Sequence, residues 1–356
     1  MNKDFNGISF VFDIDDTICN NKNRDYANAI PYTNVIDKIN NLHDRGATIK
    51  LYTSRGMVSC NGDLQKMIAK NKDVLEKWLN SNGVKYDELI FGKPIADMYI
   101  DDKTMSVRDF IKQDFCKLNG RSGYSVTRIG NIVKKEMSEK NFKKLNDWYE
   151  ASSGIAKSPE RISNLYTTMY MEYIDGKGAR DVISKKLLNK IIDQILVFSA
   201  TKYQTFDKQR LIQKIKDNQS DDEEWNRLTE DCINMIKQLD MESYATLSHA
   251  DLTLANIVVK DGDIYLLDSM FEQEASSYLM DFAKLKMSLD GYEALFCNGN
   301  EISTRYAKML SKKLKKLRIY KQVLVLEYMY AIRLYNYNEN KDLVKEFVRK
   351  VRKEIV

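Results

Sequence analysis

The 356-residue chain is long enough for two domains of ordinary size. Hydrophobic residues make up 43% of it and charged residues 30%, a balance typical of globular proteins rather than of disordered or membrane chains. The net charge of +5 is mild, which suits phosphorylated small molecules and argues against nucleic acid as a partner. With two histidines in the chain, a histidine-rich zinc site is nearly excluded.

The five cysteines lie far apart and form no CxxC pair. They are typical of free thiols in a reducing compartment, so we expect a cytoplasmic location. No run approaches the roughly 20 apolar residues that a membrane span needs, and no membrane span is expected. The first residues also lack the pattern of a signal peptide.

Strand-like and helix-like segments alternate in the first third of the chain. The alternation predicts an α/β, Rossmann-like domain with a parallel sheet and helices on its faces. The expected strands are 8–14, 47–56, 88–93 and 97–103, and the expected helices are 33–46 and 73–83.

The pattern changes near residue 120, so we expect a domain at 1–118 and a second at 122–356. The second is predicted to be bilobal and α+β, with a mainly helical part from about residue 180. Its expected elements are a hairpin at 124–137, a strand in 165–178, helices at 182–198 and 222–239, and a hairpin at 256–268. The basic run 311–318 is either a nucleic-acid patch or, as we favour, the solvated face of a helix.

The stretch FVFDIDDTIC, residues 10–19, places Asp13, Asp15 and Asp16 in an otherwise apolar run that ends near Thr17. Because side chains two apart in a strand point the same way, Asp13 and Asp15 should leave the strand end on one side. Two carboxylates about 4 Å apart repel by roughly 4 kcal/mol at an effective dielectric near 20. The stretch therefore predicts a cation between these acids.

These residues match the D-x-D-x-T signature, and the first domain resembles the haloacid dehalogenase superfamily. The stretches AIPYTNVIDKIN, LYTSRGM and FGKPIADMYIDDK resemble its capsular-polysaccharide biosynthesis phosphatases. The resemblance implies that Asp13 is a nucleophile forming an aspartyl-phosphate and that Asp15 is the general acid and base. It implies that Thr53 holds a phosphoryl oxygen and that Lys93 neutralises charge near the phosphate. Asp16 stands where glycine is more usual.

The same resemblance implies a Mg²⁺ site. Asp13, with Asp15 beside it, would form this site together with Asp101 and Asp102, since Mg²⁺ prefers oxygen ligands. The loops after the first two strands are short, so only a minimal cap is expected. Arg55 is either a ligand of the substrate phosphate or an ordinary surface arginine.

A second motif, SHADLTLANIVV, brings together His249, Asp251 and Asn256, and Asp268 follows after a short hairpin. The spacing from Asp251 to Asn256 is that of the protein-kinase catalytic loop, H-x-D-x-x-x-x-N. That chemistry needs an aspartate to accept a hydroxyl proton, and an amide and a second carboxylate to hold Mg²⁺ on nucleotide phosphates.

Neither D-F-G nor A-P-E is present, and residues 122–340 instead resemble the aminoglycoside phosphotransferase/choline kinase family. The segment 278–293 looks like the D-x-A-K-L element of members found in surface-polysaccharide gene clusters, with Asp281 structural.

By this resemblance Asp251 is the catalytic base, Asn256 and Asp268 are metal ligands, and His249 braces the loop. ATP or another nucleoside triphosphate would be the co-substrate.

The lysine that contacts the nucleotide phosphates should lie on the strand NIVKKE. Strand alternation admits either Lys134 or Lys135, and the sequence does not choose between them. Its acidic partner should lie on the following helix, where Asp147 and Glu150 are candidates.

The segment MEYID, residues 171–175, is expected to form the hinge beside adenine, with Glu172 at the nucleotide, although a plain core strand fits as well. A glycine-rich phosphate loop is missing, with Gly130 as the lone turn glycine.

Together the motifs predict a bifunctional enzyme of bacterial surface-polysaccharide biosynthesis. One domain would remove phosphate from a small phosphorylated metabolite, and the other would phosphorylate a small-molecule alcohol or sugar. The alternatives are a phosphatase regulated by a nucleotide-binding pseudokinase, or a nucleic-acid end-healing kinase-phosphatase. The last would need a Walker-type G-x-x-x-x-G-K-[ST] motif, which the chain lacks. The oligomeric state stays open.

Overall fold

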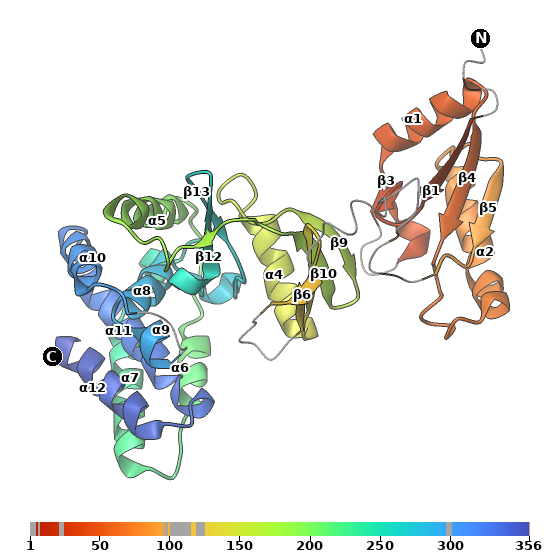
Figure 1. The fold of residues 1–356 in the computed structure, drawn as a ribbon. Coiled ribbons are helices and arrows are strands. Elements are labelled where there is room, and N and C mark those ends of the chain that lie inside the picture. The colour runs from red at the N-terminus through yellow and green to blue at the C-terminus, as the bar shows by residue number, and fades with distance from the viewer. Residues whose placement is uncertain are drawn as a thin grey trace. The chain divides into compact units, whose positions relative to one another are not determined.

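The architecture is described from a computed structural model, in which the described residues are 5, 8–20, 25–94, 96, 99, 115–118, 125–296 and 301–355. The chain divides into two compact units, Met1–Lys112 and Gln113–Val356. In Figure 1 the first runs from red to orange and the second from yellow to blue. Each unit has a hydrophobic core cluster of its own. The predicted boundary, between residues 118 and 122, lies a few residues closer to the C-terminus than the observed boundary between Lys112 and Gln113.

The first unit contains a parallel three-stranded sheet in the order β1–β4–β5 (Figure 1). The middle strand β4 (Thr48–Thr53) pairs with β1 (Ser9–Asp13) on one side and with β5 (Glu88–Phe91) on the other. The helices α1 (Thr33–Asp44) and α2 (Leu64–Ser81) lie in the crossovers that parallel pairing requires. The predicted alternation of strands and helices is confirmed for residues 8–93.

Helix α2 begins nine residues earlier than the predicted range of 73–83. The Asp63 side chain caps it by accepting a hydrogen bond from the backbone N–H of Lys66 at 3.1 Å. Met67, Asn71 and Leu75 then continue one buried face. The cap and the apolar spacing together explain the added turns.

A short antiparallel ribbon follows the acidic stretch, formed by β2 (Cys19–Asn20) and β3 (Ile30–Pro31). Most of the predicted strand over 97–103, including Asp101 and Asp102, lies outside the described residues. Their predicted role in a metal site therefore stays a prediction.

The second unit begins with an antiparallel five-stranded sheet in the order β6–β7–β8–β10–β9. The predicted hairpin at 124–137 is confirmed as β7 and β8, with Gly130 in the turn at a φ of +61°. The helix α4 (Glu139–Ala151) follows β8 (Figure 1). Its Trp148 is buried. The strands are β6 (Phe115–Lys117), β7 (Val126–Ile129), β8 (Ile132–Glu136), β9 (Arg161–Leu165) and β10 (Thr168–Glu172).

The rest of this unit is mainly helical, as predicted, with one small antiparallel sheet of β11 (Lys177–Gly178), β12 (Ile257–Lys260) and β13 (Asp263–Leu266). Its helices are α5 (Lys185–Phe198), α6 (Lys208–Lys216), α7 (Glu223–Gln238), α8 (Tyr278–Leu289), α9 (Tyr292–Phe296), α10 (Thr304–Lys316), α11 (Tyr320–Ile332) and α12 (Lys341–Ile355).

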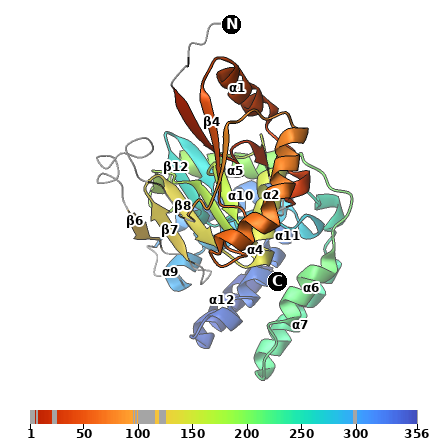
Figure 2. The same cartoon turned by 90° about the vertical axis from the view of Figure 1, so that its right-hand side faces the viewer.

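Helices α8 and α11 pack against each other at the centre of this helical part, and almost every side chain on both is buried. A helix that is apolar all round belongs in a core, and these two carry the unit's largest apolar cluster. Helices α7 and α12 lie at the same end of the unit (Figure 2) and are joined by ion pairs. Within the described ranges, none of the helices is both long and apolar enough to cross a bilayer.

Candidate functional site

In the first unit the carboxyl ends of β1 and β4 bring three predicted site residues together. Asp13 is the last residue of β1, and Thr53, which is fully buried, is the last residue of β4. Lys93 follows β5; its backbone N–H donates to the Thr53 carbonyl at 3.1 Å, and its ammonium lies 3.2 Å from Asp13 Oδ1. Ligand sites form at this edge of parallel sheets because the strands all end there.

Asp15 is held by Arg55, a contact that sequence reasoning did not predict. The Arg55 Nε lies 3.0 and 2.9 Å from the two Asp15 carboxylate oxygens, and Nη2 lies 2.9 Å from Oδ1. Arg55 is 2% exposed, and its guanidinium lies 4.6 Å from the centre of the Tyr26 ring. The structure therefore excludes the reading of Arg55 as a surface arginine. Nothing in sequence spacing signals a pair forty residues apart.

The acidic stretch is thus partly compensated by protein cations. Burial raises the pKa of Asp13, although the neighbouring Lys93 ammonium lowers it. The carboxylate therefore needs more positive charge than Lys93 alone supplies.

Asp16 lies at a φ of +57°, a left-handed conformation that glycine adopts freely and that aspartate tolerates better than most residues. Aspartate can therefore occupy the position where the resembling family more often has glycine.

In the second unit the structure chooses between the two lysines of β8. Lys135 is buried, and its ammonium forms an ion pair with the Asp268 carboxylate. Lys134 lies 3.5 Å from Glu136 on the same strand. Lys135 is therefore the lysine that the fold directs to Asp268, the predicted metal ligand.

The predicted catalytic loop places Asp251 and Asn256 in direct contact. The Asn256 side-chain nitrogen donates to the Asp251 carbonyl at 2.8 Å and to Asp251 Oδ2 at 3.0 Å. Lys284 of α8 lies 2.9 Å from Asp251 Oδ1. Burial alone would raise the pKa of Asp251, but the Lys284 ammonium beside it gives a net lowering.

Lys284 is a site residue that sequence reasoning missed. It lies within the D-x-A-K-L segment, which had drawn attention to Asp281 alone. Asp281 does brace the loop, because its two carboxylate oxygens each accept a backbone hydrogen bond at 2.8 Å, from His249 and Ala250. Burial raises the pKa of Asp281 to about 8, which these two hydrogen bonds oppose.

Two residues of this site have left-handed backbone, Ala250 at a φ of +65° and Asp268 at +58°. This conformation is costly for alanine, and such strain gathers at functional sites. The Asp281 carboxylate offsets it by binding the N–H of Ala250.

His249 is fully buried, and the polar groups that act on its ring are the backbone of Leu267 and of Asp251, without hydrogen bonds of good geometry. Its ring packs edge-on against Trp148, with centroids 5.1 Å apart. Burial lowers the pKa of His249 to about 4. A neutral, buried imidazole fits the predicted bracing role.

On the nucleotide side, Glu172 ends β10, and its backbone N–H donates to the Glu160 carbonyl at 2.8 Å. The two acids proposed as partners of the lysine have partners on their own helix: Asp147 pairs with Lys143, and Glu150 accepts from Asn146. The roles of Glu172, Asp147 and Glu150 stay predictions.

An ion pair joins α4 to the segment after Asp268, but here α4 supplies the lysine and the segment supplies the acid. Lys144 of α4 lies 2.5 Å from Glu272 Oε1, and Lys214 of α6 lies 3.3 Å from the same atom. The lysine neighbours give Glu272 a pKa of about 2, outweighing the effect of burial. Sequence reasoning missed this pair as well.

The residues present fit a hard divalent cation in both units, although the part of the chain that the structure describes contains no cluster of three acidic, histidine or cysteine ligands. Asn256 uses its side-chain nitrogen in hydrogen bonds, so its oxygen is the group available to a metal near Asp268. Carboxylate and amide oxygens are what Mg²⁺ prefers. In the first unit, the incomplete compensation of Asp13 is the observation that fits a cation.

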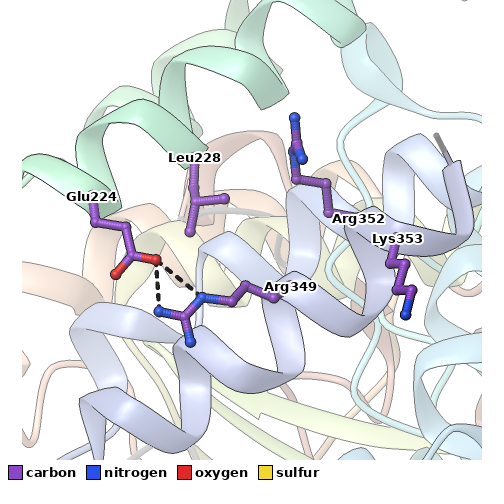
Figure 3. Close-up of a pocket in the computed structure, with 5 residues that line it drawn as sticks. All are labelled: Glu224, Leu228, Arg349, Arg352 and Lys353. Atoms are coloured by element: carbon purple, nitrogen blue, oxygen red, sulfur yellow. Dashed lines mark hydrogen bonds and ion pairs between the residues drawn. The ribbon is translucent and has the colours of Figure 1, made fainter.

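A pocket of about 440 Å³ lies elsewhere, between α7 and α12 (Figure 3), and contains none of the predicted site residues. Its Arg349 is bound to Glu224 at 2.6 Å, and Arg352 lies 2.7 Å from Asp231. Because these cations are already paired with acids, the pocket is a weak candidate for an anion site.

No protein-family model matches the chain, and no curated protein matches it either. Among solved structures, a structural-genomics target from Vibrio cholerae is similar at 28% identity, with a TM-score of 0.27, over 30% of this chain and 89% of that one.

A choline/ethanolamine kinase family protein from Mesorhizobium loti is similar at 10% identity and a TM-score of 0.48, over 67% of this chain and 87% of that one. The aminoglycoside phosphotransferase APH(4)-Ia, in a thermostable form, is similar at 10% identity and a TM-score of 0.49, over 68% and 94%. Both TM-scores lie below 0.5.

Proposed function

We propose that residues 113–356 transfer a phosphoryl group from a nucleoside triphosphate to a hydroxyl of a small molecule. The observation that carries the proposal is a set of two contacting pairs, Asp251 with Asn256 and Lys135 with Asp268. The backbone N–H of Leu267 donates to the Asn256 carbonyl at 2.9 Å and so links the two segments. These are the residue types that kinases use for base, metal and phosphate binding.

In this reaction Asp251 accepts the proton of the acceptor hydroxyl. The acceptor oxygen forms a bond to the γ-phosphorus, and the bond to the bridging β-phosphate oxygen breaks, giving the nucleoside diphosphate and a phosphomonoester. Lys135 binds the nucleotide phosphates. Asn256 and Asp268 would hold a Mg²⁺ ion, which would supply further positive charge there. Lys284 keeps Asp251 ionised and so able to take the proton.

The test is phosphoryl transfer by the Asp251→Asn variant. Loss of the base should lower kcat by about 10²–10⁴-fold while Mg-ATP still binds in calorimetry. Asp261→Asn is the matched control, since it changes the exposed turn of the β12–β13 hairpin and should leave turnover unaltered. Binding of Mg-ATP by the unaltered protein without any turnover would instead favour a nucleotide-binding pseudokinase.

We propose as a second candidate that residues 1–112 hydrolyse a small sugar- or polyol-phosphate. The observation in its favour is the convergence of Asp13, Thr53 and Lys93 at the end of one sheet, with Asp15 beside them. Asp13 attacks phosphorus and releases the alcohol, which Asp15 protonates; Asp15 then activates the water that cleaves the aspartyl-phosphate.

Phosphate release from a panel of sugar- and polyol-phosphates tests this candidate. Asp13→Asn should abolish release, whereas Asp37→Asn, an exposed position on α1, should not. The two activities should be lost independently in Asp13→Asn and Asp251→Asn; coupled loss would contradict two separate sites. We also propose that both activities serve surface-polysaccharide biosynthesis. The dephosphorylated product of the first unit and the phosphorylated product of the second should then be compounds that such a pathway consumes.

A further inference from the structure

The environment of Asp251 restricts the charge of any acceptor that binds there. Both carboxylate oxygens are already engaged: Oδ1 lies 2.9 Å from the Lys284 ammonium, and Oδ2 accepts from the Asn256 amide at 3.0 Å. The Asp251 side chain is 31% exposed and that of Lys284 is 15% exposed, so solvent reaches both. A hydroxyl that donates to Asp251 must therefore lie close to the Lys284 ammonium.

Arg333 adds a second positive charge beside the same loop. Both cations lie near the ring of Tyr330 on α11, with the Lys284 nitrogen 4.3 Å and the Arg333 guanidinium carbon 5.9 Å from its centroid. The Tyr330 hydroxyl donates to the Ala250 carbonyl at 3.3 Å, which places the ring directly against the catalytic loop. Arg333 is half-buried and forms no ion pair within the described part of the chain.

The nearby acids do not cancel this charge. Glu272 is shared by Lys144, Lys214 and Arg210, at 2.5, 3.3 and 3.5 Å. Burial lowers the pKa of Lys214, and the positive charges of Arg333 and Lys144 act in the same direction, against Glu272. Glu272 is therefore already engaged by three other cations, and the described residues show no ion pair between it and Arg333.

We propose that the acceptor of the second unit is an anionic small molecule, a hydroxy compound that carries a phosphate or carboxylate close to the hydroxyl to be phosphorylated. The inference rests on the kinase function proposed above. Lys284 lies beside the reacting hydroxyl, and Arg333 binds the acceptor's anionic group. A cationic acceptor would be repelled by the same two side chains.

Two matched sets of acceptors test the proposal with Mg-ATP and the full chain carrying Asp13→Asn, so that the hydrolysis proposed for the first unit does not consume the phosphorylated acceptors. One is glycerol, glycerate, glycerol 3-phosphate and 3-amino-1,2-propanediol; the other is glucose, gluconate, glucose 6-phosphate and glucosamine. Within a set, kcat/KM for the anionic members should exceed that of the neutral parent by about tenfold or more, and the cationic member should be poorest. Comparing the phosphate with the carboxylate member identifies the anionic group.

Arg333→Gln should lower the ratio of anionic to neutral kcat/KM about tenfold, chiefly through KM, and Arg333→Lys should restore part of it. Arg349→Gln is the matched control, because this arginine pairs with Glu224 on α7 and should leave the ratio unaltered. An equal ratio in the unaltered protein and Arg333→Gln, or preferred use of neutral or cationic acceptors, overturns the inference while the kinase function stands.

Failure of every acceptor to be phosphorylated would count against the kinase function itself. The inference is then decided by calorimetry with the same compounds and the Mg-ADP-bound protein. The inference is supported if the anionic members bind and Arg333→Gln weakens their binding. It is overturned if all members of a set bind equally or none binds.

Discussion

The two candidate catalytic aspartates have a lysine at similar distance, yet their environments shift the pKa in opposite directions. Asp13 of the first unit lies 3.2 Å from Lys93, and burial nevertheless raises its pKa. Asp251 of the second unit lies 2.9 Å from Lys284, and its pKa is lowered despite burial. The second aspartate also accepts a hydrogen bond from Asn256, which favours its charged form.

The difference indicates how each unit prepares its aspartate. In the second unit, α8 supplies a fixed cation, and Asp251 is ionised before any ligand arrives. In the first unit Asp13 is under-compensated, so an additional cation would favour its nucleophilic, ionised form. We therefore expect a divalent ion to matter for the charge of Asp13 itself, and in the second unit mainly for the nucleotide phosphates.

The largest effect is expected from removing the lysine that we propose binds the nucleotide phosphates. Lys135→Met should lower kcat/KM for phosphoryl transfer by about 10²–10³-fold, since it deletes a buried cation paired with Asp268. Lys134→Met, the adjacent lysine, should have little effect because Lys134 lies near Glu136. Steady-state kinetics of both variants decide between them, and equal losses would contradict the assignment.

Acid should destabilise the second unit through His249, whose pKa falls from 6.5 to about 4 on burial. Between these values the unfolded chain binds a proton that the folded one does not, so stability is lost as the pH falls through this window. The loss should reach about 3 kcal/mol at pH 4.

Urea unfolding at several pH values measures this effect. His249→Phe should flatten the dependence between pH 6.5 and 4, because it removes the group whose pKa burial lowers. An unchanged slope in this variant would show that another group carries the acid sensitivity.

A smaller effect should follow from removing the cation that distinguishes Asp251 from Asp13. In Lys284→Met the pKa of Asp251 should rise, so the acidic limb of the kcat profile should move to higher pH. Turnover near pH 7 should fall by about 10- to 100-fold. Lys308→Met, an exposed lysine on α10, is the control. A uniform fall at every pH would indicate a role other than keeping Asp251 ionised.

The smallest effect concerns the stability of the first unit. Arg55→Met should lower its free energy of unfolding by about 1–3 kcal/mol, because it leaves Asp15 without its buried partner. The surface pair of Lys50 and Glu88, 2.7 Å apart, is the comparison: Lys50→Met should cost less than about 1 kcal/mol. Thermal unfolding of both variants tests the ranking.

Local sequence was enough to predict the elements that carry the sites. The strand before Asp13 was predicted from its apolar run and the hairpin between Asn256 and Asp268 from its turn residues, and both are present. The predicted start of α2, at residue 73, was wrong because the first two turns of the helix, from Leu64, are polar on all but one narrow face. The ion pair of Lys144 with Glu272 could not be predicted, since it joins a helix to a loop far along the chain.

Short-range spacing therefore determined which acids and amides stand together in this protein: Asp13 with Asp15, and Asp251 with Asn256. Only the tertiary structure decided which cations face them, namely Arg55, Lys135 and Lys284. The reason is physical: neighbours in a strand or loop are set by backbone geometry, whereas an ion pair across many residues depends on how helices and sheets pack.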